Sequence, residues 1–305
     1  MIHTLQEILC AAKASEPCTL AVAAAQDEDV LTAVCAAQRE GIIRPLLVGD
    51  RAQIEAIAVQ NALTIDPADI LDEPDKTAAC QTAARLAGEG KANLLMKGFV
   101  DTGVIMKAVL NHENNLRQSG TISHVAVMEV PGFDRLFYVT DSAMNVAPDL
   151  EQKAAILRNA VQTAHALGNE EPKAAVLCAV EKVNPKMPCT LDAQALTQRA
   201  QNGEFGRCLV QGPLALDNAV SPQAARHKKI DGPVAGYADI LLVPDIEAGN
   251  MLNKAMEYFA HAGKASIMMG AKVPIVLTSR ATSAESKMYS IALGVLIAAK
   301  RKEQP

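Results

Sequence analysis

The segment VPIVLTSRATSAESK, residues 273–287, shows how this chain is put together. It begins as an aliphatic, partly β-branched run that is typical of a buried strand, and the run stops at residues 279–280. The tetrapeptide TSAE (282–285) then matches the capping box S/T-x-x-E, with Thr282 as the N-cap and Glu285 as the third helical residue. The segment therefore predicts a buried strand that leads directly into a helix, the unit from which α/β folds are built.

The same alternation of aliphatic runs and helical patterns extends through most of the chain. Between 121 and 141 two β-like runs flank the sequence PGFD, which predicts a hairpin instead of a strand–helix–strand unit. A helix from Ser283 to Lys300 is expected to close the chain. Strands are predicted at 19–25, 44–50, 92–98, 173–180, 208–214, 238–245 and 273–279.

This order predicts an α/β fold of the doubly wound type, with mostly parallel sheets and right-handed crossovers. The number of strands is large for one sheet, so we expect two lobes with a boundary near 141–150. A length of 305 residues agrees with two domains or one large α/β domain. Half of the residues are hydrophobic, aromatic residues are few and Trp is absent, so the core is expected to consist of Ala, Val, Leu, Ile and Met. Such a core suits helices packed on parallel strands.

Composition also limits the kinds of partner. A net charge of −5 argues against a general nucleic-acid-binding surface, which is normally basic, although a local basic pocket for a small anion is compatible with it.

Residues 1–15 lack a signal-peptide pattern, and no apolar run approaches the ~20 residues needed to span a bilayer. The seven cysteines are irregularly spaced without C-x-x-C. We therefore expect a cytoplasmic protein with buried, reduced thiols; a catalytic cysteine is the alternative.

The first candidate site residues are Ser279 and Arg280, at the end of the last predicted strand. They precede a helix N-terminus, where free backbone N–H groups and the helix dipole favour an anion. An Arg guanidinium adds a planar fork that matches phosphate. The alternative to an anion site is that Arg280 is an ordinary surface Arg beside a Ser in a turn. The presence of Glu285 is explained by helix capping alone.

A second candidate segment is LLVPDIEAGNMLNKA, residues 241–255. Asp245 is most simply the N-cap of the helix that follows. Gly249 and Asn250 then lie early in that helix, where Gly costs about 1 kcal/mol relative to Ala. This cost indicates a close approach by a ligand or by the other lobe.

A third candidate segment is LLMKGFVDTGVIMK, residues 94–107. Lys97 and Gly98 follow the third predicted strand, and Thr102 or the preceding Asp caps the next helix. Lys97 and Lys107 can meet an anion, although each alone is more often a solvated Lys.

Several other chemistries are not indicated by the sequence. It contains no G-x-x-x-x-G-K-S/T, G-x-G-x-x-G or G-x-S-x-G motif. The six His residues have no zinc-ligand spacing, and no group of Asp residues suggests a magnesium site.

Five ordered blocks together resemble the phosphate acetyl/butyryl transferase family over nearly the whole chain. The compact length and the sequences MKGFVDTG and GPLALDNA are most similar to its butyryl branch. The blocks are LLMKGFVDTG (94–103), FYVTDSAMNVAPDLEQKA (137–154), GPLALDNAVS (212–221), IDGPVAGYADILLVPDIEAGNML (230–252) and VPIVLTSRATSAESK (273–287).

The resemblance implies a reversible reaction in which acyl-CoA and phosphate give acyl phosphate and CoA. It implies two three-layer α/β/α lobes with an active-site cleft, akin to the isocitrate/isopropylmalate dehydrogenase fold, in a homodimer or larger homo-oligomer. The final helix then returns to the first lobe, which comprises 1–141 and 276–305, while the second comprises 142–275. Acyl transfer without redox change requires no metal or prosthetic group.

The resemblance also assigns roles to residues. Arg280 is expected to hold phosphate, and Ser279 to donate to the developing oxyanion or the departing sulfur. Phosphate and CoA contacts are expected from Lys97, Gly98, Thr102, Lys107, Asp245, Gly249 and Asn250.

Two departures from the acetyl branch favour the butyryl branch. Ser286 aligns with an aspartate proposed there as a base, so Glu285, another carboxylate or the dianionic form of phosphate would replace it. Lys107 stands where the acetyl branch uses Arg.

The alternatives to a phosphate butyryltransferase are a phosphate acetyltransferase, a metal-dependent decarboxylating dehydrogenase, and a non-catalytic acyl-CoA-binding module.

Overall fold

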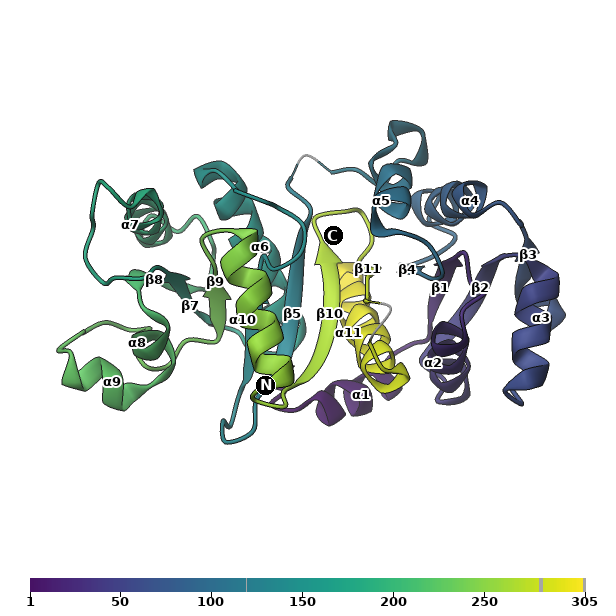
Figure 1. Ribbon diagram of the computed structural model, residues 1–305, viewed down its shortest axis with the longest axis horizontal. Coiled ribbons are helices and arrows are strands. Elements are labelled where there is room, and N and C mark those ends of the chain that lie inside the picture. Colours follow the sequence, from purple (N-terminus) through teal and green to yellow (C-terminus); the bar gives the residue numbers. More distant parts are fainter. Residues whose placement is uncertain (119, 280–281, 304–305) are drawn as a thin grey trace. The chain divides into compact units, whose positions relative to one another are not determined.

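The computed structural model of the chain describes residues 1–118, 120–279 and 282–303 (Figure 1). The backbone divides into two units, each with its own internal packing. Unit 1 comprises Met1–Thr4 and Gly120–Lys264, and unit 2 comprises Leu5–Ser119 and Ala265–Pro305. The lobe boundaries expected at 141/142 and 275/276 stay a prediction.

Unit 2 is built on strands in the order β3-β2-β1-β4-β11-β10. All neighbouring pairs are parallel except β10 and β11, where Met268 faces Ile275 in an antiparallel pair. Figure 1 shows α4 and α5 on one side of these strands and α1, α2 and α11 on the other. The strands are β1 (Cys18–Ala23), β2 (Ile43–Gly49), β3 (Ile70–Asp72), β4 (Leu94–Lys97), β10 (Gly263–Met269) and β11 (Ile275–Val276). The helices are α1 (Leu5–Lys13), α2 (Glu28–Arg39), α3 (Arg51–Gln60), α4 (Lys76–Gly88), α5 (Thr102–Leu110) and α11 (Ala284–Glu303), with short 3₁₀ turns η1 (Pro67–Asp69) and η2 (His112–Asn114).

Unit 1 has the strand order β5-β6-β9-β7-β8. The predicted hairpin is confirmed, because β5 and β6 pair antiparallel with Ala126 opposite Val139, and the other neighbouring pairs are parallel. The strands are β5 (Ser123–Glu129), β6 (Leu136–Thr140), β7 (Lys173–Leu177), β8 (Leu209–Leu214) and β9 (Ile240–Leu242). The helices are α6 (Leu150–Ala166), α7 (Pro188–Gln201), α8 (Leu216–Val220), α9 (Pro222–His227) and α10 (Ile246–Tyr258).

Aspartate side chains determine where several helices begin. Asp27, Asp50 and Asp75 follow β1, β2 and β3, and each accepts a hydrogen bond from the amide three residues later, at 2.9, 3.0 and 2.7 Å. An N-cap of this kind satisfies one of the free amides of the first helical turn. In unit 1, Asp149 does the same for α6 and Gln152 completes a capping box.

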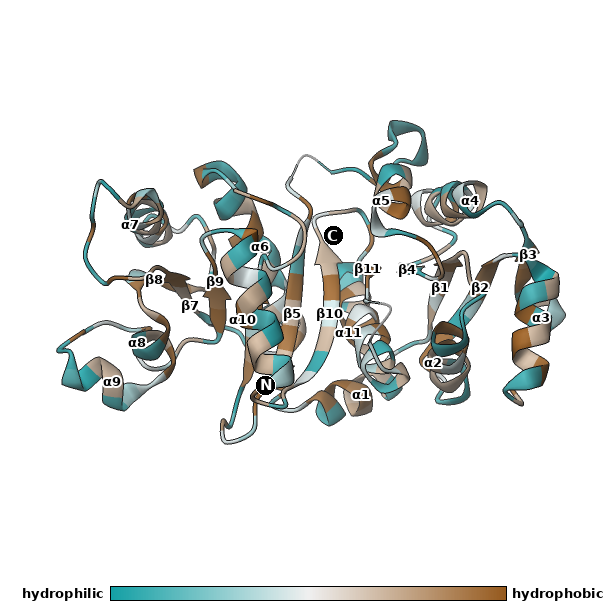
Figure 2. Cartoon of the chain, viewed as in Figure 1, coloured by the Kyte–Doolittle hydropathy of each residue, from teal (hydrophilic) through white to brown (hydrophobic). Residues whose placement is uncertain are grey.

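The cores are aliphatic, as the composition predicts. Figure 2 shows hydrophobic strands in both units, beside helices that carry a hydrophobic and a hydrophilic face. The buried cluster of unit 1 contains Phe137 as its one aromatic member among Ala, Val, Leu and Met side chains. The prediction of an α/β fold with mostly parallel strands is confirmed. The sequence pattern does not predict two strands that the structure contains, β3 and β10.

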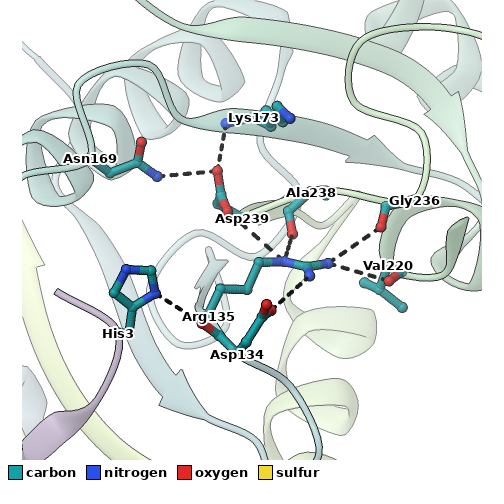
Figure 3. A network of polar contacts seen from close by, with 9 residues as sticks. All are labelled: His3, Asp134, Arg135, Asn169, Lys173, Val220, Gly236, Ala238 and Asp239. Atoms are coloured by element: carbon teal, nitrogen blue, oxygen red, sulfur yellow. Dashed lines mark hydrogen bonds and ion pairs between the residues drawn. The ribbon is translucent and has the colours of Figure 1, made fainter. Parts of the chain in front are cut away.

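Arg135 holds the hairpin of unit 1 against the segment that precedes β9 (Figure 3). Its Nε donates to the carbonyl oxygen of Ala238 at 3.1 Å, and its Nη2 donates to those of Val220 at 3.3 Å and Gly236 at 3.5 Å. Its Nε also lies 4.0 Å from Asp239 Oδ1. One guanidinium thus satisfies carbonyl groups from the end of α8 and from the segment before β9.

Asp239 continues this network on its other side (Figure 3). Its Oδ2 accepts hydrogen bonds from the backbone amide of Lys173 at 2.9 Å and from Asn169 Nδ2 at 3.1 Å. Burial raises the pKa of this carboxyl, although these donors and Arg135 act against the rise. At the hairpin, His3 Nδ1 donates to the carbonyl oxygen of Asp134 at 2.9 Å.

Candidate active site

The carboxyl ends of three parallel strands of unit 2 lie at one edge of its sheet. Ala23 of β1 pairs with Lys97 of β4, and Val276 of β11 pairs with Met96 of β4. The residues that follow these strands therefore emerge side by side, as is usual for binding sites in α/β folds. Three of the predicted site residues belong to segments that end or leave the sheet here: Lys97 ends β4, Gly98 follows it, and Ser279 follows β11.

Ser279 and Thr282 lie between β11 and α11. Arg280, the predicted phosphate ligand, and Ala281 lie outside the described residues. The backbone amide of Thr282 donates to the carbonyl oxygen of Ser279 at 3.1 Å. Ser279 is exposed at this edge and Thr282 is buried.

The helix cap differs from the predicted one by a single residue. Helix α11 begins at Ala284, and Ser283 Oγ accepts a hydrogen bond from the Ser286 amide at 3.2 Å. Ser283 is therefore the N-cap, and the predicted capping box of Thr282 and Glu285 is wrong. The exposed Glu285 instead accepts a hydrogen bond from the Tyr289 hydroxyl at 3.2 Å. A role for Glu285 as a base stays a prediction.

Gly98 is required by a close approach of two backbone segments. Its amide donates to the carbonyl oxygen of Ala23 at 2.8 Å, and a Cβ at this position would lie 2.1 Å from the carbonyl oxygen of Ala24. Lys97 is buried, and its Nζ donates to the carbonyl oxygens of Gly98 at 3.2 Å and Val100 at 3.0 Å. Lys97 thus supports the loop after β4.

Helix α5 carries the two other predicted contacts of this segment. Thr102 is its first residue and Lys107 lies in its last turn; both are exposed. Their contacts with phosphate or CoA stay predictions.

In unit 1 the predicted close approach at Gly249 is made by the chain itself. A Cβ on Gly249 would lie 2.7 Å from the carbonyl oxygen of Asp141 and 3.0 Å from Ser142 Cα. Asn250 Nδ2 donates to the carbonyl oxygen of Ser142 at 3.4 Å. Asp245 caps α10, as predicted, and accepts from the Ala248 amide at 2.8 Å. The first turn of α10 is therefore packed on the loop that follows β6.

That loop is organised by the buried carboxylate of Asp141, which the sequence prediction did not single out. Its Oδ1 accepts from the amides of Ala143 and Met144, both at 3.0 Å, and its Oδ2 accepts from the amide and side chain of Asn145 at 3.2 and 2.5 Å. A sequence signal exists, because Asp in a TDSAMN stretch favours bonds to its own following backbone.

His124 is a second buried polar residue beside the same loop. Its Nδ1 lies 3.0 Å from Ser142 Oγ. Burial lowers the pKa of His124 to about 4, with nearby Asp141 opposing the shift and Lys264 adding to it. The ring is therefore neutral at pH 7 and serves as a structural hydrogen-bonding group.

The alternative chemistries gain no support from the described part of the chain. Within it, no three His, Cys, Asp or Glu side chains are grouped so as to hold a metal ion. Burial raises the pKa of Cys178 and Cys208 to about 12 and that of Cys80 to about 11, which disfavours a nucleophilic thiolate. None of the helices in these residues has the length and apolar character of a membrane span.

Comparison with known proteins identifies the family. A family model described as phosphate acetyl/butaryl transferase matches residues 3–85 and 73–295. The chain belongs to this family. A probable phosphate butyryltransferase of Bacillus subtilis strain 168 is 50% identical over 291 residues, which are 95% of this chain and 97% of that protein. A phosphate acetyltransferase of Rhizobium meliloti is 43% identical over 295 residues, covering 97% and 93%.

A solved structure of the same kind supports the fold. The branched-chain phosphotransacylase of Enterococcus faecalis V583 matches with a TM-score of 0.80 at 34% identity, covering 92% of this chain and 99% of that one. These relatives are named as acyltransferases, so this chain is a member of an acyltransferase family with a mixed α/β fold.

Proposed function

We propose that this protein is a phosphate acyltransferase that transfers a short acyl group, butyryl in particular, between CoA and inorganic phosphate. The observation that carries the proposal is the 50% identity over 95% of the chain to a protein named as a probable phosphate butyryltransferase. The sequence position of Arg280 supports it, because Arg280 falls between the end of β11 and the N-terminus of α11.

The reaction proceeds in one acyl transfer. An oxygen of phosphate attacks the carbonyl carbon of the thioester; the C–O bond forms, the C–S bond breaks, and the proton of hydrogen phosphate ends on the CoA sulfur. Arg280 holds phosphate by bidentate hydrogen bonds, and the free amides of the first turn of α11 add donors. Ser279 donates to the oxyanion or the leaving sulfur. Holding phosphate and the thioester carbonyl close together and correctly oriented supplies a large part of the rate acceleration.

The remaining expectations form part of the same proposal. Two lobes, 1–141 with 276–305 and 142–275, enclose the reacting groups in a cleft, and the protein is a cytoplasmic homodimer or larger homo-oligomer. Lys97, Gly98, Thr102, Lys107, Asp245, Gly249 and Asn250 shape the phosphate and CoA sites. No metal or prosthetic group is required, since acyl transfer involves no redox change.

Phosphate acetyltransferase is the alternative within the family, favoured by the 43% identical Rhizobium meliloti relative. A non-catalytic acyl-CoA-binding module is the alternative from another class, because Ser286 stands where the acetyl branch has a proposed base. Such a module would bind CoA but release no thiol on addition of phosphate.

A thiol-release assay on acetyl-, butyryl- and longer acyl-CoAs, with and without phosphate, tests the proposal. We expect phosphate-dependent release that is greatest for four-carbon acyl groups. Two added methylenes are worth about 1.6 kcal/mol in an apolar pocket, or roughly 15-fold in kcat/KM over acetyl-CoA. Arg280→Lys keeps the charge but loses the fork, so we expect turnover to fall at least tenfold, by about 1.4 kcal/mol. Normal kinetics in this variant would refute the role of Arg280.

A further inference from the structure

A cavity of about 480 Å³ opens on unit 1 between helix α9 and the loop that leads into β9. This volume is sufficient for a small molecule. None of the described residues that line the cavity is among those proposed for acyl transfer. Its apolar surface comes from side chains that are buried or partly buried: Pro222, Ala225, Ile230 and Ala235.

The cavity lies at the amino ends of the strands of unit 1. Tyr237, which forms part of its wall, precedes β9 by three residues. Lys173, the first residue of the parallel strand β7, places Nζ 5.1 Å from the centroid of the Tyr237 ring. Substrates of α/β folds usually bind at the carboxyl ends of the strands, so this cavity is a different kind of place in the fold.

The loop that walls the cavity is held in place by Gln211 of β8. Gln211 Oε1 accepts hydrogen bonds from the amides of Val234 and Ala235 at 3.1 and 3.2 Å. Its Nε2 donates to the carbonyl oxygen of Asp231 at 2.8 Å. A wall fixed in this way is formed before a ligand arrives, which lowers the ordering cost of binding.

Two cations line the cavity without a counter-ion. Arg226 and Lys229 are exposed, and neither lies within 4.0 Å of a carboxylate oxygen in the part of the chain that the structure describes. Lys228 between them differs, because it pairs with Glu181 and Asp217, both at 3.0 Å. Lys229 also has a left-handed backbone, with φ of 56°, at a position after a helix where Gly is usual. The chain thus keeps a cation at a backbone position that disfavours it, and a phosphate group would supply the missing counter-charge.

The other polar groups of the cavity match the remaining parts of a nucleotide. The Tyr237 side chain is 50% exposed, and an exposed aromatic ring is a platform on which a base stacks. The exposed carboxylate of Asp231 can accept hydrogen bonds from ribose hydroxyls, as acidic residues do in dinucleotide sites. Phosphate, sugar and base therefore each have a matching group in one cavity.

We infer that this cavity binds a ribonucleoside phosphate, with its phosphate on Arg226 and Lys229, its sugar at Asp231 and its base on Tyr237. The inference goes beyond the proposed acyl transfer and does not rest on it. It gives unit 1 a nucleotide site that is separate from the reaction.

Isothermal titration calorimetry with AMP and adenosine as probes tests the inference. We expect AMP to bind at least tenfold more tightly than adenosine, because adenosine leaves the two cations unpaired. Tyr237→Ala should raise the Kd of both probes at least fivefold, since stacking is lost. Arg226→Gln should raise the Kd of AMP at least fivefold and leave that of adenosine within twofold of wild type.

Two control variants isolate these effects. Lys228→Gln removes the neighbouring cation that is already paired, so the Kd of AMP should stay within twofold of the wild-type value. Tyr237→Phe keeps the aromatic ring and should also stay within twofold. All the substituted side chains are exposed, so the variants are expected to fold.

Several results would overturn the inference. One is the absence of saturable AMP binding to the wild type up to about 10 mM. Another is an unchanged Kd of AMP in Tyr237→Ala, which would reduce the cavity to an anion site at most, and a third is an equal loss in Lys228→Gln. A rise of at least fivefold in KM for butyryl-CoA in Tyr237→Ala would place the nucleotide end of CoA in the cavity and overturn a separate site; we expect this KM to stay within twofold. Because calorimetry reports binding, a protein that releases no thiol refutes the proposed function and leaves the nucleotide test in force.

Discussion

Neutral His124 makes the stability of unit 1 depend on pH. Its ring is 5% exposed and faces Ser142 Oγ at 3.0 Å, and burial lowers the pKa of the imidazole from 6.5 to about 4. Between these two pH values the unfolded chain holds a proton that the folded chain does not. The free energy of unfolding therefore rises with pH through this window. The pKa difference of about 2.5 units, at 1.36 kcal/mol per unit, corresponds to about 3 kcal/mol lost on going from pH 7 to pH 4.

NMR titration of the ring C–H resonances checks the pKa directly, with His124→Asn used to assign the His124 signal. Urea unfolding of both proteins at pH 4.5, 5.5, 6.5 and 7.5 checks the energy. Asn retains a polar group toward Ser142 and does not titrate, so its loss of stability on acidification should be smaller than that of wild type by up to about 3 kcal/mol. A His124 ring that titrates at pH 6 or above, or parallel pH profiles for the two proteins, would refute the reasoning.

Three substitutions test the packing and the hydrogen bonding of the fold. Gly98→Ala would place a methyl group 2.1 Å from the carbonyl oxygen of Ala24, so we expect acyl transfer to fall at least tenfold and the urea midpoint to decrease; wild-type kcat/KM would contradict this. Gly249→Ala would place Cβ 2.7 Å from the Asp141 carbonyl oxygen and should destabilise the fold by about 1–3 kcal/mol in urea unfolding, with an unchanged midpoint as the contrary result. Arg135→Lys cannot reach three carbonyl groups at once and should cost about 1–3 kcal/mol, measured in the same way; equal stability would show that the fork is dispensable.

Local signals in the sequence predict most of the architecture. Aliphatic runs followed by aspartate mark where β1 and β2 end and α2 and α3 begin, because both the strand pattern and the cap are encoded within a few residues. The sequence also indicated that Lys97, Gly98 and Ser279 lie at or after the carboxyl ends of strands, where α/β folds usually place their binding residues.

Long-range contacts account for what the sequence pattern does not predict. Strand β10 has the sequence GKASIMM, in which Ala, Ser and Met give no clear two-residue period, so its strand character comes from pairing within the sheet, which the local pattern does not encode. The cost of Gly249 in a helix indicated a close approach, but only the fold identifies the Asp141–Ser142 loop as the approaching group.

The N-cap of α11 and the burial of Lys287 also could not be predicted from the sequence pattern. The sequence TSAES offers two hydroxyl residues in succession as N-cap, and the Lys287 bond to the Thr282 carbonyl accompanies the choice of Ser283. A Lys in an amphipathic helix is normally solvated, so its burial here could not be read from the pattern.

The central claim is that phosphate attacks the thioester and leaves with the acyl group. Phosphorus-31 NMR of a mixture of the protein, butyryl-CoA and inorganic phosphate tests it most directly, with free thiol measured in the same sample. We expect an acyl phosphate resonance that grows in step with thiol, one molecule of each, and that grows at least tenfold more slowly with Arg280→Lys. Thiol released without acyl phosphate, or no thiol released from any short acyl-CoA, would contradict the account.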